Sequence, residues 1–421
     1  MIPLGKFVIE NSGRLNGKVR VSGSKNSVLP IIAATLLTDE TCTIHDVPAL
    51  TDVFVMQNII EDLGGTAHWD AAAETLSITA SNIKKTEAPY ELCAKMRASF
   101  LAAGPLLARM GEVKMSLPGG CAIGSRPVDL HLKGLAALGA TIAQEHGYVY
   151  ARARKLVGAN IYLDFPSVGA TENIMMAAAL AKGQTIIQNC AVEPEIVDLS
   201  NFLTSMGAQI RGSGTDTIRI YGVDTLSGTS HNIIPDRIEA GTFMIAAAIT
   251  QGDVIITNAV TDHLKPAIAK LREAEVAVEE NEDGIRIVGT RHKKPIDVKT
   301  LPYPGFPTDM QAQFISMLAT TPGTNIVTET VFENRFMHVP ELVRMGADIK
   351  IDSRTAIIEG VERLTGTSVK TPDLRAGAAL VLAALAASGT TEVHDIYHID
   401  RGYFKFDEKL RGLGAKISRI D

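Results

Sequence analysis

Charged residues recur at one fixed position in the apolar helical segments of this chain. Four segments carry such a residue 14 positions before their last residue, namely Lys25, Arg97, Asp309 and Arg375. That position is expected to be the N-terminus of a helix. Basic side chains there oppose the helix dipole, which costs roughly a few tenths of a kcal/mol for each. Another group is therefore expected to compensate for these charges.

A second set of charged residues precedes the glycine-containing ends of later helical segments. Asp52, Arg126, Arg335 and Arg401 lie 12, 13, 11 and 13 residues before Gly64, Gly139, Gly346 and Gly414. Both sets are predicted to lie where helices begin, so that helix N-termini and basic side chains could hold an anionic ligand together. The basic residues come from both ends of the chain, which predicts a cleft between two domains, whereas the middle offers Glu172, Glu195, Glu239 and His263. The alternative interpretation is a set of solvated surface charges.

One glycine-rich segment combines a cysteine with an arginine. It reads Pro-Gly-Gly-Cys-Ala-Ile-Gly-Ser-Arg-Pro-Val-Asp over residues 118–129. Two of its glycines have the spacing of a P-loop, but Ser125 and Arg126 stand where that motif needs lysine and then serine or threonine, which disfavours a Walker A site. Backbone amides could still meet an anion. Cys121, flanked by glycines near Arg126, is a candidate for a lowered pKa and an exposed thiol, although an isolated loop cysteine is more often inert.

The charged positions belong to a unit that occurs six times. Helical segments end in Leu-Gly-Gly or a similar triplet at 63–65, 138–140, 206–208, 345–347 and 413–415, with a degenerate Ala-Glu-Val copy at 274–276. The spacings between the central residues are 75, 68, 68, 71 and 68. Repetition at such a period usually defines the whole architecture.

Each unit is predicted to contain strand, helix, strand, helix, strand and strand. In the first unit these are expected at 18–21, 27–37, 41–44 and 53–63, with the last two strands between 67 and 78. The first helices are apolar on nearly all sides, as in 171–181, 241–249 and 376–387, so they must be shielded all round. Three such helices inside a jacket of sheets would form a barrel with helices within and strands outside. An open solenoid is less favoured because it leaves one helix layer facing water.

The length of the chain predicts two domains. At 421 residues it is too long for one ordinary core, and three units in each domain is the natural division. We expect one domain at 22–232 and the other at 233–421 together with 1–21. The sixth unit ends with a single strand-like segment, 415–420, so the N-terminal residues are expected to supply its missing strand.

Composition excludes several classes of protein. The net charge of −6 and the pI near 6.0 argue against a general nucleic-acid or membrane-surface binder. The spacing of the cysteines indicates neither a disulfide framework nor a zinc site. The N-terminus does not resemble a signal peptide, and the longest apolar stretch, 376–387, is too short to span a bilayer. We therefore expect a cytoplasmic enzyme or scaffold.

Motifs along the whole chain resemble those of the enolpyruvyl transferases. They are Gly23-Ser-Lys25-Asn26, Lys95-Met-Arg97, the segment 118–131, Pro235-Asp-Arg-Ile-Glu239, Pro307-Thr-Asp309, Glu333-Asn-Arg335, Asp373-Leu-Arg375 and Asp400-Arg401-Gly-Tyr403. The resemblance implies an α/β fold of two inside-out α/β barrels, each of three units, with the active site in the cleft between the domains. The loop around Cys121 is the most specific motif, and it indicates the branch of the family that uses UDP-N-acetylglucosamine.

The resemblance also implies a reaction of addition and elimination through a tetrahedral intermediate. An enolpyruvyl group would pass from phosphoenolpyruvate to the 3-hydroxyl of UDP-N-acetylglucosamine with release of phosphate, the first committed step of peptidoglycan synthesis. Asp309 would take the proton from the sugar hydroxyl. Cys121 would act as general acid toward the methylene carbon and could form a covalent adduct with the enolpyruvyl unit.

Other residues that match the family motifs would bind the two substrates. The resemblance implies that the phosphate is held by Lys25, Arg126 and Arg401, and the carboxylate by Arg335 and Arg375. Asn26 would help to hold the intermediate, and Arg97 would support nucleotide-sugar binding. The sugar nucleotide would contact Arg126, Pro127, Val128, Asp129, Leu130 and Val331. Ser167, Val168 and Gly169 also match, but Phe165 stands where some members have lysine, so no lysine contact to the diphosphate is implied there.

The expected chemistry suits these residue types. Phosphoenolpyruvate carries a phosphate and a carboxylate, so it needs several fixed cations, and arginine binds both groups in a bidentate manner. Protonation of the vinyl carbon needs a well-placed acid, and the cationic carbon needs a nearby negative charge. We expect no metal or organic cofactor, and small molecules rather than nucleic acid or a membrane as partners. The alternatives are transfer to 3-phosphoshikimate, a P-loop phosphotransferase and a non-catalytic repeat scaffold.

Overall fold

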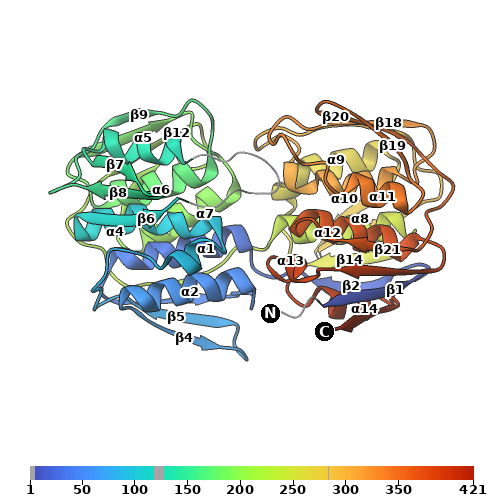
Figure 1. The fold of residues 1–421 in the computed structure, drawn as a ribbon, viewed down its shortest axis with the longest axis horizontal. Helices are drawn as coiled ribbons and strands as arrows, with labels where there is room; N and C mark the ends of the chain where they lie inside the picture. Colours follow the sequence, from blue (N-terminus) through green and yellow to red (C-terminus); the bar gives the residue numbers. More distant parts are fainter. Residues whose placement is uncertain (1–4, 118–127, 283) are drawn as a thin grey trace. The chain divides into compact units, whose positions relative to one another are not determined.

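The computed structural model describes residues 5–117, 128–282 and 284–421, and their contacts divide them into two compact units. Residues 23–117 and 128–234 form one, which we call the middle unit. Residues 5–22 and 235–421 form the other, which we call the terminal unit because it contains both chain ends. Figure 1 shows the elements of each unit.

The middle unit contains the first three repeats. The first comprises α1 (Lys25–Ala34) with η1 (Thr35–Leu37), β3 (Thr41–His45), α2 (Thr51–Leu63), β4 (Thr66–Asp70) and β5 (Thr75–Thr79). The second comprises α3 (Tyr90–Cys93), η2 (Arg97–Ala102), α4 (Ala103–Met110), β6 (Glu112–Ser116), α5 (Asp129–Ala137), β7 (Thr141–Glu145) and β8 (Tyr148–Arg152). The third comprises β9 (Asn160–Tyr162), α6 (Val168–Ala179), β10 (Gln184–Gln188), α7 (Pro194–Ser205), β11 (Gln209–Arg211) and β12 (Thr217–Tyr221), and β13 (Ser230–Asn232) follows.

The terminal unit begins with β1 (Lys6–Glu10) and β2 (Asn16–Arg20). The fourth repeat comprises α8 (Arg237–Ile249), β14 (Asp253–Thr257), η3 (Thr261–Leu264), α9 (Lys265–Glu273), β15 (Ala277–Asn281) and β16 (Gly284–Val288). The fifth comprises β17 (Asp297–Lys299), η4 (Thr308–Met310), α10 (Gln311–Leu318), β18 (Thr324–Thr328), α11 (Val339–Arg344), β19 (Asp348–Asp352) and β20 (Thr355–Glu359). The sixth comprises β21 (Ser368–Lys370), α12 (Leu374–Ala386), β22 (Thr390–His394), α13 (Tyr397–Asp400), α14 (Phe406–Gly412) and β23 (Ile417–Ile420).

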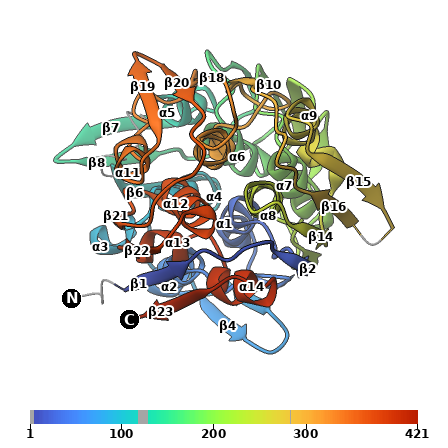
Figure 2. The same ribbon diagram turned by 90° about the vertical axis from the view of Figure 1, so that its right-hand side faces the viewer.

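The apolar helices predicted from the sequence lie in the interior of their units. In α12 every residue from Arg375 to Leu385 is buried, and the same holds for residues 238–249 of α8 and 170–179 of α6. In the terminal unit α8, α10 and α12 pack against one another, and strands surround them (Figure 2). The interpretation as a barrel with helices within and strands outside is confirmed. The open solenoid is excluded because no helix layer of this kind faces water in the described repeats.

The second repeat departs from the predicted order of elements. It lacks the leading strand among its described residues, where a single parallel bridge joins Glu87 to Lys114, and its sheet has the order β6-β8-β7. Pro89 follows almost directly and has no backbone N–H to donate, so the strand cannot extend. The expectation of strand, helix, strand, helix, strand and strand is therefore wrong for this repeat.

Strand pairing draws together segments that are far apart in the sequence. In the middle unit β13 pairs in parallel with β3, and in the terminal unit β2 pairs in parallel with β14, so the first and fourth repeats have exchanged their leading strands. Strand β1 lies between β22 and β23 and is antiparallel to both (Figure 2). The sixth repeat thus obtains from the N-terminus the strand that its own sequence lacks.

The repeated helix endings share a left-handed backbone conformation. Gly64, Gly207 and Gly414 have φ of 110°, 108° and 96°, values that favour glycine. The degenerate copy places Glu275 at the equivalent position with a φ of 62°. This substitution explains why the triplet is hardest to recognise in the fourth repeat, although its backbone follows the same path.

Candidate active site

The terminal unit brings together three of the predicted site residues in one ion-paired cluster. Arg335 Nη2 donates a hydrogen bond to Asp309 Oδ1 at 2.9 Å. Arg375 donates to Asp309 Oδ2 from both Nη2, at 3.0 Å, and Nε, at 3.2 Å. The side chains of Arg335 and Arg375 are only 3 % and 4 % exposed, whereas Asp309 is 27 % exposed. The cluster therefore consists of a partly exposed carboxylate paired with two buried guanidinium groups. The alternative interpretation as solvated surface charges is wrong for Arg335 and Arg375.

The local backbone explains the position of each member. Asp309 lies in η4 directly before α10, and Arg375 lies in the first turn of α12. The carboxylate of Asp373 caps α12 by accepting hydrogen bonds from the backbone amides of Arg375 at 2.8 Å and Ala376 at 3.0 Å. That cap satisfies amides at the helix start and fixes the backbone from which the Arg375 side chain extends.

Two predicted helix-start residues lie elsewhere. Arg335 lies four residues before α11, which begins at Val339, and Arg401 directly follows the end of α13. Pro340 explains the first case, since proline fits within the first turn of a helix and not further along it. The prediction that both sets lie at helix starts is therefore wrong for Arg335 and Arg401, while Lys25, Asp52 and Arg375 do occupy such positions.

The electrostatics of the cluster oppose simple base catalysis. Burial would raise the pKa of the Asp309 carboxyl, but the charges of Arg375 and Arg335 outweigh it and hold that pKa well below its usual value. So weak a base accepts protons poorly. Arg335 Nε and Arg375 Nη1 are buried without a hydrogen-bond partner among the described residues. These donors could serve an anion that competes with Asp309 for the two arginines.

A buried histidine beside the cluster was not singled out from the sequence. His338 is 0 % exposed, and its two ring nitrogens have no hydrogen-bond partner among the residues that the structure describes. Burial lowers the pKa of His338 to about 4, an effect that nearby Asp373 opposes and Arg335 reinforces. The ring is therefore neutral at physiological pH and adds no third positive charge. Its position three residues after Arg335 is the signal that could have drawn attention to it.

The middle unit contains a second ion pair made from predicted charges. Lys25, the first residue of α1, places Nζ 2.7 Å from Oδ2 of Asp52 in the first turn of α2. Their side chains are 10 % and 3 % exposed. Ser27, two residues after Lys25, donates a hydrogen bond to Asp198 of α7. Asn26 lies between Lys25 and Ser27 in the first turn of α1. The Lys25 ammonium is thus held at a helix start by an internal carboxylate.

The predicted sugar-nucleotide residues of the middle unit lie at the starts of neighbouring helices. Val128 precedes α5, and Asp129 and Leu130 begin it. Ser167 caps α6, with its Oγ 3.4 Å from the amide of Ala170, and Val168 and Gly169 form the first turn.

The two helices meet closely at this end. A side chain on Gly169 would place its Cβ 3.2 Å from Cε1 of His131 in α5, so the helices approach each other at glycine. Phe165, the position where some family members have lysine, is 46 % exposed. Arg97 begins η2 in the same unit.

Other predicted residues lie apart from these groups or outside the description. Val331 belongs to a turn of the terminal unit, where its amide donates to Glu329 Oε1 at 2.8 Å. Cys121, Arg126 and Pro127 lie outside the described residues.

The other cysteines, Cys42, Cys93 and Cys190, are free and buried, and burial raises the pKa of each thiol, to about 11 for Cys190. These three thiols are therefore poor nucleophiles.

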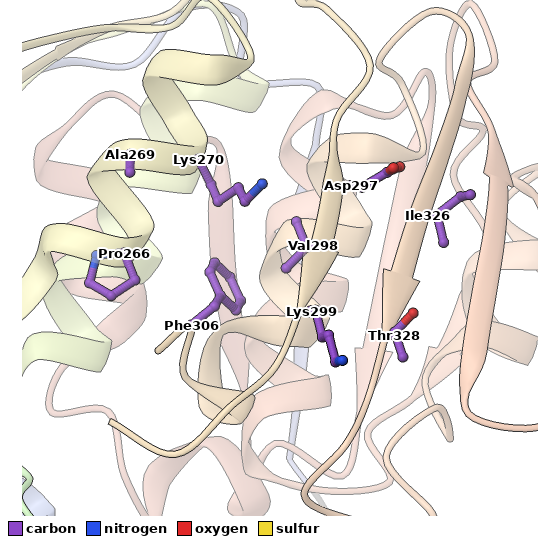
Figure 3. A pocket seen from close by; sticks show the side chains of 9 residues that line it. All are labelled: Pro266, Ala269, Lys270, Asp297, Val298, Lys299, Phe306, Ile326 and Thr328. Atoms are coloured by element: carbon purple, nitrogen blue, oxygen red, sulfur yellow. The ribbon is translucent and has the colours of Figure 1, made fainter. Parts of the chain in front are cut away.

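A separate surface hollow of about 450 Å³ lies on the terminal unit, and it contains none of the predicted residues. Figure 3 shows Pro266, Ala269 and Lys270 of α9 on one side and Val298 of β17 on the other.

No group of histidine, cysteine and acidic residues that could hold a metal is present in the described part of the chain. A search of the same residues finds no helix long and apolar enough to cross a membrane.

Comparison with known proteins shows the family to which this chain belongs. The family model described as EPSP synthase (3-phosphoshikimate 1-carboxyvinyltransferase) matches residues 9–410, so the chain belongs to this family of enolpyruvyl transferases. The enolpyruvyl transferase NikO from Streptomyces tendae has a similar structure, with a TM-score of 0.90, 27 % identity and 99 % of each chain covered. EPSP synthase from Acinetobacter baumannii, with a TM-score of 0.78 and 21 % identity, shares the fold over 99 % of this chain and 100 % of its own.

Curated relatives within the family are more similar in sequence. UDP-N-acetylglucosamine 1-carboxyvinyltransferase 1 of Caldanaerobacter subterraneus subsp. tengcongensis is 60 % identical over 414 residues, which is 98 % of this chain and 99 % of the relative. UDP-N-acetylglucosamine 1-carboxyvinyltransferase 2 of Carboxydothermus hydrogenoformans is also 60 % identical, over 417 residues and 99 % of each chain. The expected resemblance to the enolpyruvyl transferases and the predicted fold class are confirmed.

Proposed function

We propose that this protein transfers the enolpyruvyl group of phosphoenolpyruvate to the 3-hydroxyl of UDP-N-acetylglucosamine and releases phosphate. This reaction commits the sugar nucleotide to peptidoglycan synthesis. The observation that carries the proposal is the carboxylate of Asp309 held between two buried arginines that keep unused donors. The choice of sugar nucleotide over 3-phosphoshikimate is supported by relatives at 60 % identity that are named for that substrate.

In this proposal the carboxylate of phosphoenolpyruvate binds Arg335 and Arg375. Arginine pairs in a bidentate manner with carboxylates, and Arg335 Nε and Arg375 Nη1 are already buried without protein partners in the described structure. As the two guanidinium groups turn toward the ligand, they move away from the Asp309 carboxylate and stabilise its charged form less. The pKa of Asp309 then rises toward its usual value. Substrate binding would thus convert Asp309 from an ion-pair partner into a base for the sugar hydroxyl.

Lys25 takes the phosphate in the same scheme, together with Arg126 and Arg401. The Lys25 side chain is held in an ion pair with Asp52, so a phosphate that reaches it meets a fixed basic group at the start of α1. Cys121 supplies a proton to the methylene carbon, and the sugar 3-oxygen bonds to the neighbouring carbon as Asp309 takes the hydroxyl proton. In the elimination the bond to the phosphate oxygen breaks, phosphate leaves with the proton held by Asp309, and the Cys121 thiolate takes back a proton from the methyl carbon. Asp309 carries its negative charge until it takes the hydroxyl proton, so it stabilises the cationic carbon before the bond to the sugar oxygen forms.

The sugar nucleotide is proposed to bind residues that match the family motifs. The residues are Arg97, Arg126, Pro127, Val128, Asp129, Leu130, Ser167, Val168, Gly169 and Val331, while Asn26 is proposed to help to hold the intermediate. Backbone amides at the starts of α5 and α6 suit a diphosphate, since helix N-termini favour anions. The proposed chemistry requires only small-molecule partners and no cofactor. We further propose that the functional domains are residues 22–232 and residues 1–21 with 233–421.

The assay for this proposal measures phosphate released from phosphoenolpyruvate by the purified chain. Release should require UDP-N-acetylglucosamine and should yield a sugar nucleotide heavier by one enolpyruvyl group in the mass spectrum. Shikimate 3-phosphate should not replace it. Release with shikimate 3-phosphate alone would assign the chain to the other branch, and no release with either acceptor would favour a non-catalytic role.

A further inference from the structure

We propose that Tyr403 is a positioning residue for the ion pair of Arg375 and Asp309, an inference that rests on the proposed function. Tyr403 is only 2 % exposed and lies two residues after Arg401. Its ring lies against Arg375, with the guanidinium carbon 5.4 Å from the ring centroid. At this distance an arginine interacts favourably with an aromatic face. The ring therefore limits how the guanidinium of Arg375 can turn.

The hydroxyl of Tyr403 is anchored to the inner helices of the terminal unit. Its Oη lies 2.9 Å from Oγ1 of Thr242 in α8, and Gln313 Nε2 of α10 donates to it at 3.2 Å. Thr242 in turn donates to the backbone oxygen of Ile238 at 2.8 Å. One buried hydroxyl thus ties the segment that follows α13 to two helices of the core.

The same network reaches the backbone of Asp309. Gln313 Nε2 is 2.9 Å from the carbonyl oxygen of Asp309 and 3.2 Å from Thr242 Oγ1. Tyr403 therefore contacts the side chain of Arg375 directly, and through Gln313 it contacts the turn that carries Asp309. Both partners of the ion pair are held by this single side chain and its hydrogen bonds.

Packing alone does not account for a tyrosine at this position. The ring of Tyr403 lies 4.8 Å from that of Phe406, and Phe406 in turn lies 5.8 Å from Phe243, so one side of the Tyr403 ring packs against aromatic core residues. Phenylalanine would fill the same space without a buried hydroxyl that needs partners. The hydroxyl is explained if its role is to fix the ring beneath Arg375.

The test is a kinetic double-mutant cycle between Tyr403 and Arg375, measured as kcat/KM for phosphoenolpyruvate. Tyr403→Phe keeps the ring and removes its anchor, so kcat/KM should fall roughly 10-fold to 100-fold, as expected when a reacting group is slightly misplaced. In an Arg375→Lys background the planar guanidinium is absent, so Tyr403→Phe should have an effect of less than about twofold. Independent, multiplying effects of the two changes would overturn the proposal.

Ser316→Ala is the matched control because Ser316 Oγ donates to the backbone oxygen of Ala379 at 2.8 Å and so joins α10 to α12 in the same core. It removes a buried hydrogen bond without touching Arg375 or Asp309. Its unfolding midpoint should fall about as much as that of Tyr403→Phe, while kcat/KM stays within about twofold of the parent. An equal loss of activity in Ser316→Ala would show that any lesion of this core suffices and would overturn the role of Tyr403.

Two further measurements keep the inference testable. If Tyr403→Phe does not fold, Thr242→Val can be used instead, because it removes the other end of the same hydrogen bond. Thr242→Val should lower kcat/KM in the parent and leave it unchanged in the Arg375→Lys background. An unchanged kcat/KM in both backgrounds would overturn the proposal. Phosphoenolpyruvate should raise the unfolding midpoint of the parent more than that of Tyr403→Phe, and this difference should disappear in the Arg375→Lys background; this measurement needs no turnover. An equal rise in the parent and in Tyr403→Phe would also overturn the proposal. Parent activity with the two acceptors tests the proposed function separately, so the two failures are distinguishable.

Discussion

Replacing Asp309 by asparagine removes the negative charge from the arginine cluster while preserving the size of the side chain. In the parent, Asp309 accepts hydrogen bonds from Arg335 at 2.9 Å and from Arg375 at 3.0 and 3.2 Å. Asparagine has one acceptor oxygen in place of two. The variant therefore leaves two buried guanidinium groups, 3 % and 4 % exposed, with no carboxylate between them.

The expected loss of stability follows from this geometry. Removing one partner of a buried ion pair costs about 3–5 kcal/mol. Because the Asp309 side chain is 27 % exposed, we expect a smaller cost of about 2 kcal/mol. For a domain of about 200 residues this corresponds to a fall of roughly 4–8 °C in the unfolding temperature of the terminal unit. The middle unit, which does not contain Asp309, should keep its transition.

Calorimetry and turnover together test Asp309→Asn. Turnover should fall roughly 10²–10⁴-fold because the proposed base is lost. Phosphoenolpyruvate should nevertheless raise the unfolding temperature of the variant more than that of the parent, since its carboxylate replaces the missing charge and no longer competes with Asp309. This opposite change in binding and turnover is the distinguishing result.

The pH dependence gives an independent check on the ion pair. The pKa of Asp309 is held well below its usual value by Arg375 and Arg335, which outweigh the effect of burial. Such a group contributes stability that is present above its unfolded pKa of about 4 and is lost as the pH falls through its folded pKa. The stability difference between parent and Asp309→Asn should therefore be constant near neutral pH and narrow below about pH 4. Equal stability of the two proteins at pH 7, or weaker stabilisation of the variant by phosphoenolpyruvate, would refute the reasoning.

Three further outcomes are expected. Cys121→Ser should lower turnover roughly 10²–10⁴-fold, and Cys121→Asp should retain activity because a protonated carboxyl can also donate; inactivity of the Asp variant in the phosphate-release assay would argue against a general acid here. Glu172→Gln should stabilise the protein more at pH 8 than at pH 5. Burial, and then the charge of Glu195, raise the pKa of Glu172 well above its usual value, so the parent loses stability as the pH rises above about 4. The same difference in unfolding free energy between the two proteins at both pH values, measured in urea, would contradict this. Gly23→Ala would place a Cβ 2.0 Å from the carbonyl oxygen of Asp46, so the free energy of unfolding measured in urea should fall by roughly 3 kcal/mol, and an unchanged midpoint would show that the backbone shifts freely.

Periodicity was sufficient to predict the interior of the fold. The apolar helices expected at 171–181, 241–249 and 376–387 are buried along nearly their whole length, because a helix without a polar face has only interior positions open to it. Periodicity was insufficient where one residue changes the local backbone. Pro89 follows the single bridge that stands in place of a leading strand in the second repeat, and α11 begins beyond Arg335, with Pro340 in its first turn. Individual prolines thus set boundaries that the repeat period does not report.

The partners of the charged residues could not be read from the sequence. The spacing placed Lys25 and Asp309 in one set of equivalent charges and Asp52 in the other, but the pairing of Lys25 with Asp52 depends on how α1 packs against α2. The placement of Asp309 between two arginines likewise depends on three separate elements of the terminal unit. Tyr403 gave no signal beyond its place after Arg401, since a buried hydroxyl gains its meaning from groups distant in sequence.

The position of β1 between β22 and β23 has a consequence for synthesis on the ribosome. Ile9 pairs with Ile417, so about 400 residues must be translated before the strand meets its second neighbour. At about 5–20 residues per second, that interval is roughly 20–80 s, during which Phe7 and Ile9, both fully buried in the finished protein, have no sheet to enter. The middle unit can fold in the meantime, because all its strands are made by residue 232. Stalled chains that end before residue 390 should therefore contain a protease-resistant middle unit and a protease-sensitive N-terminus, and equal protection of both would contradict this order.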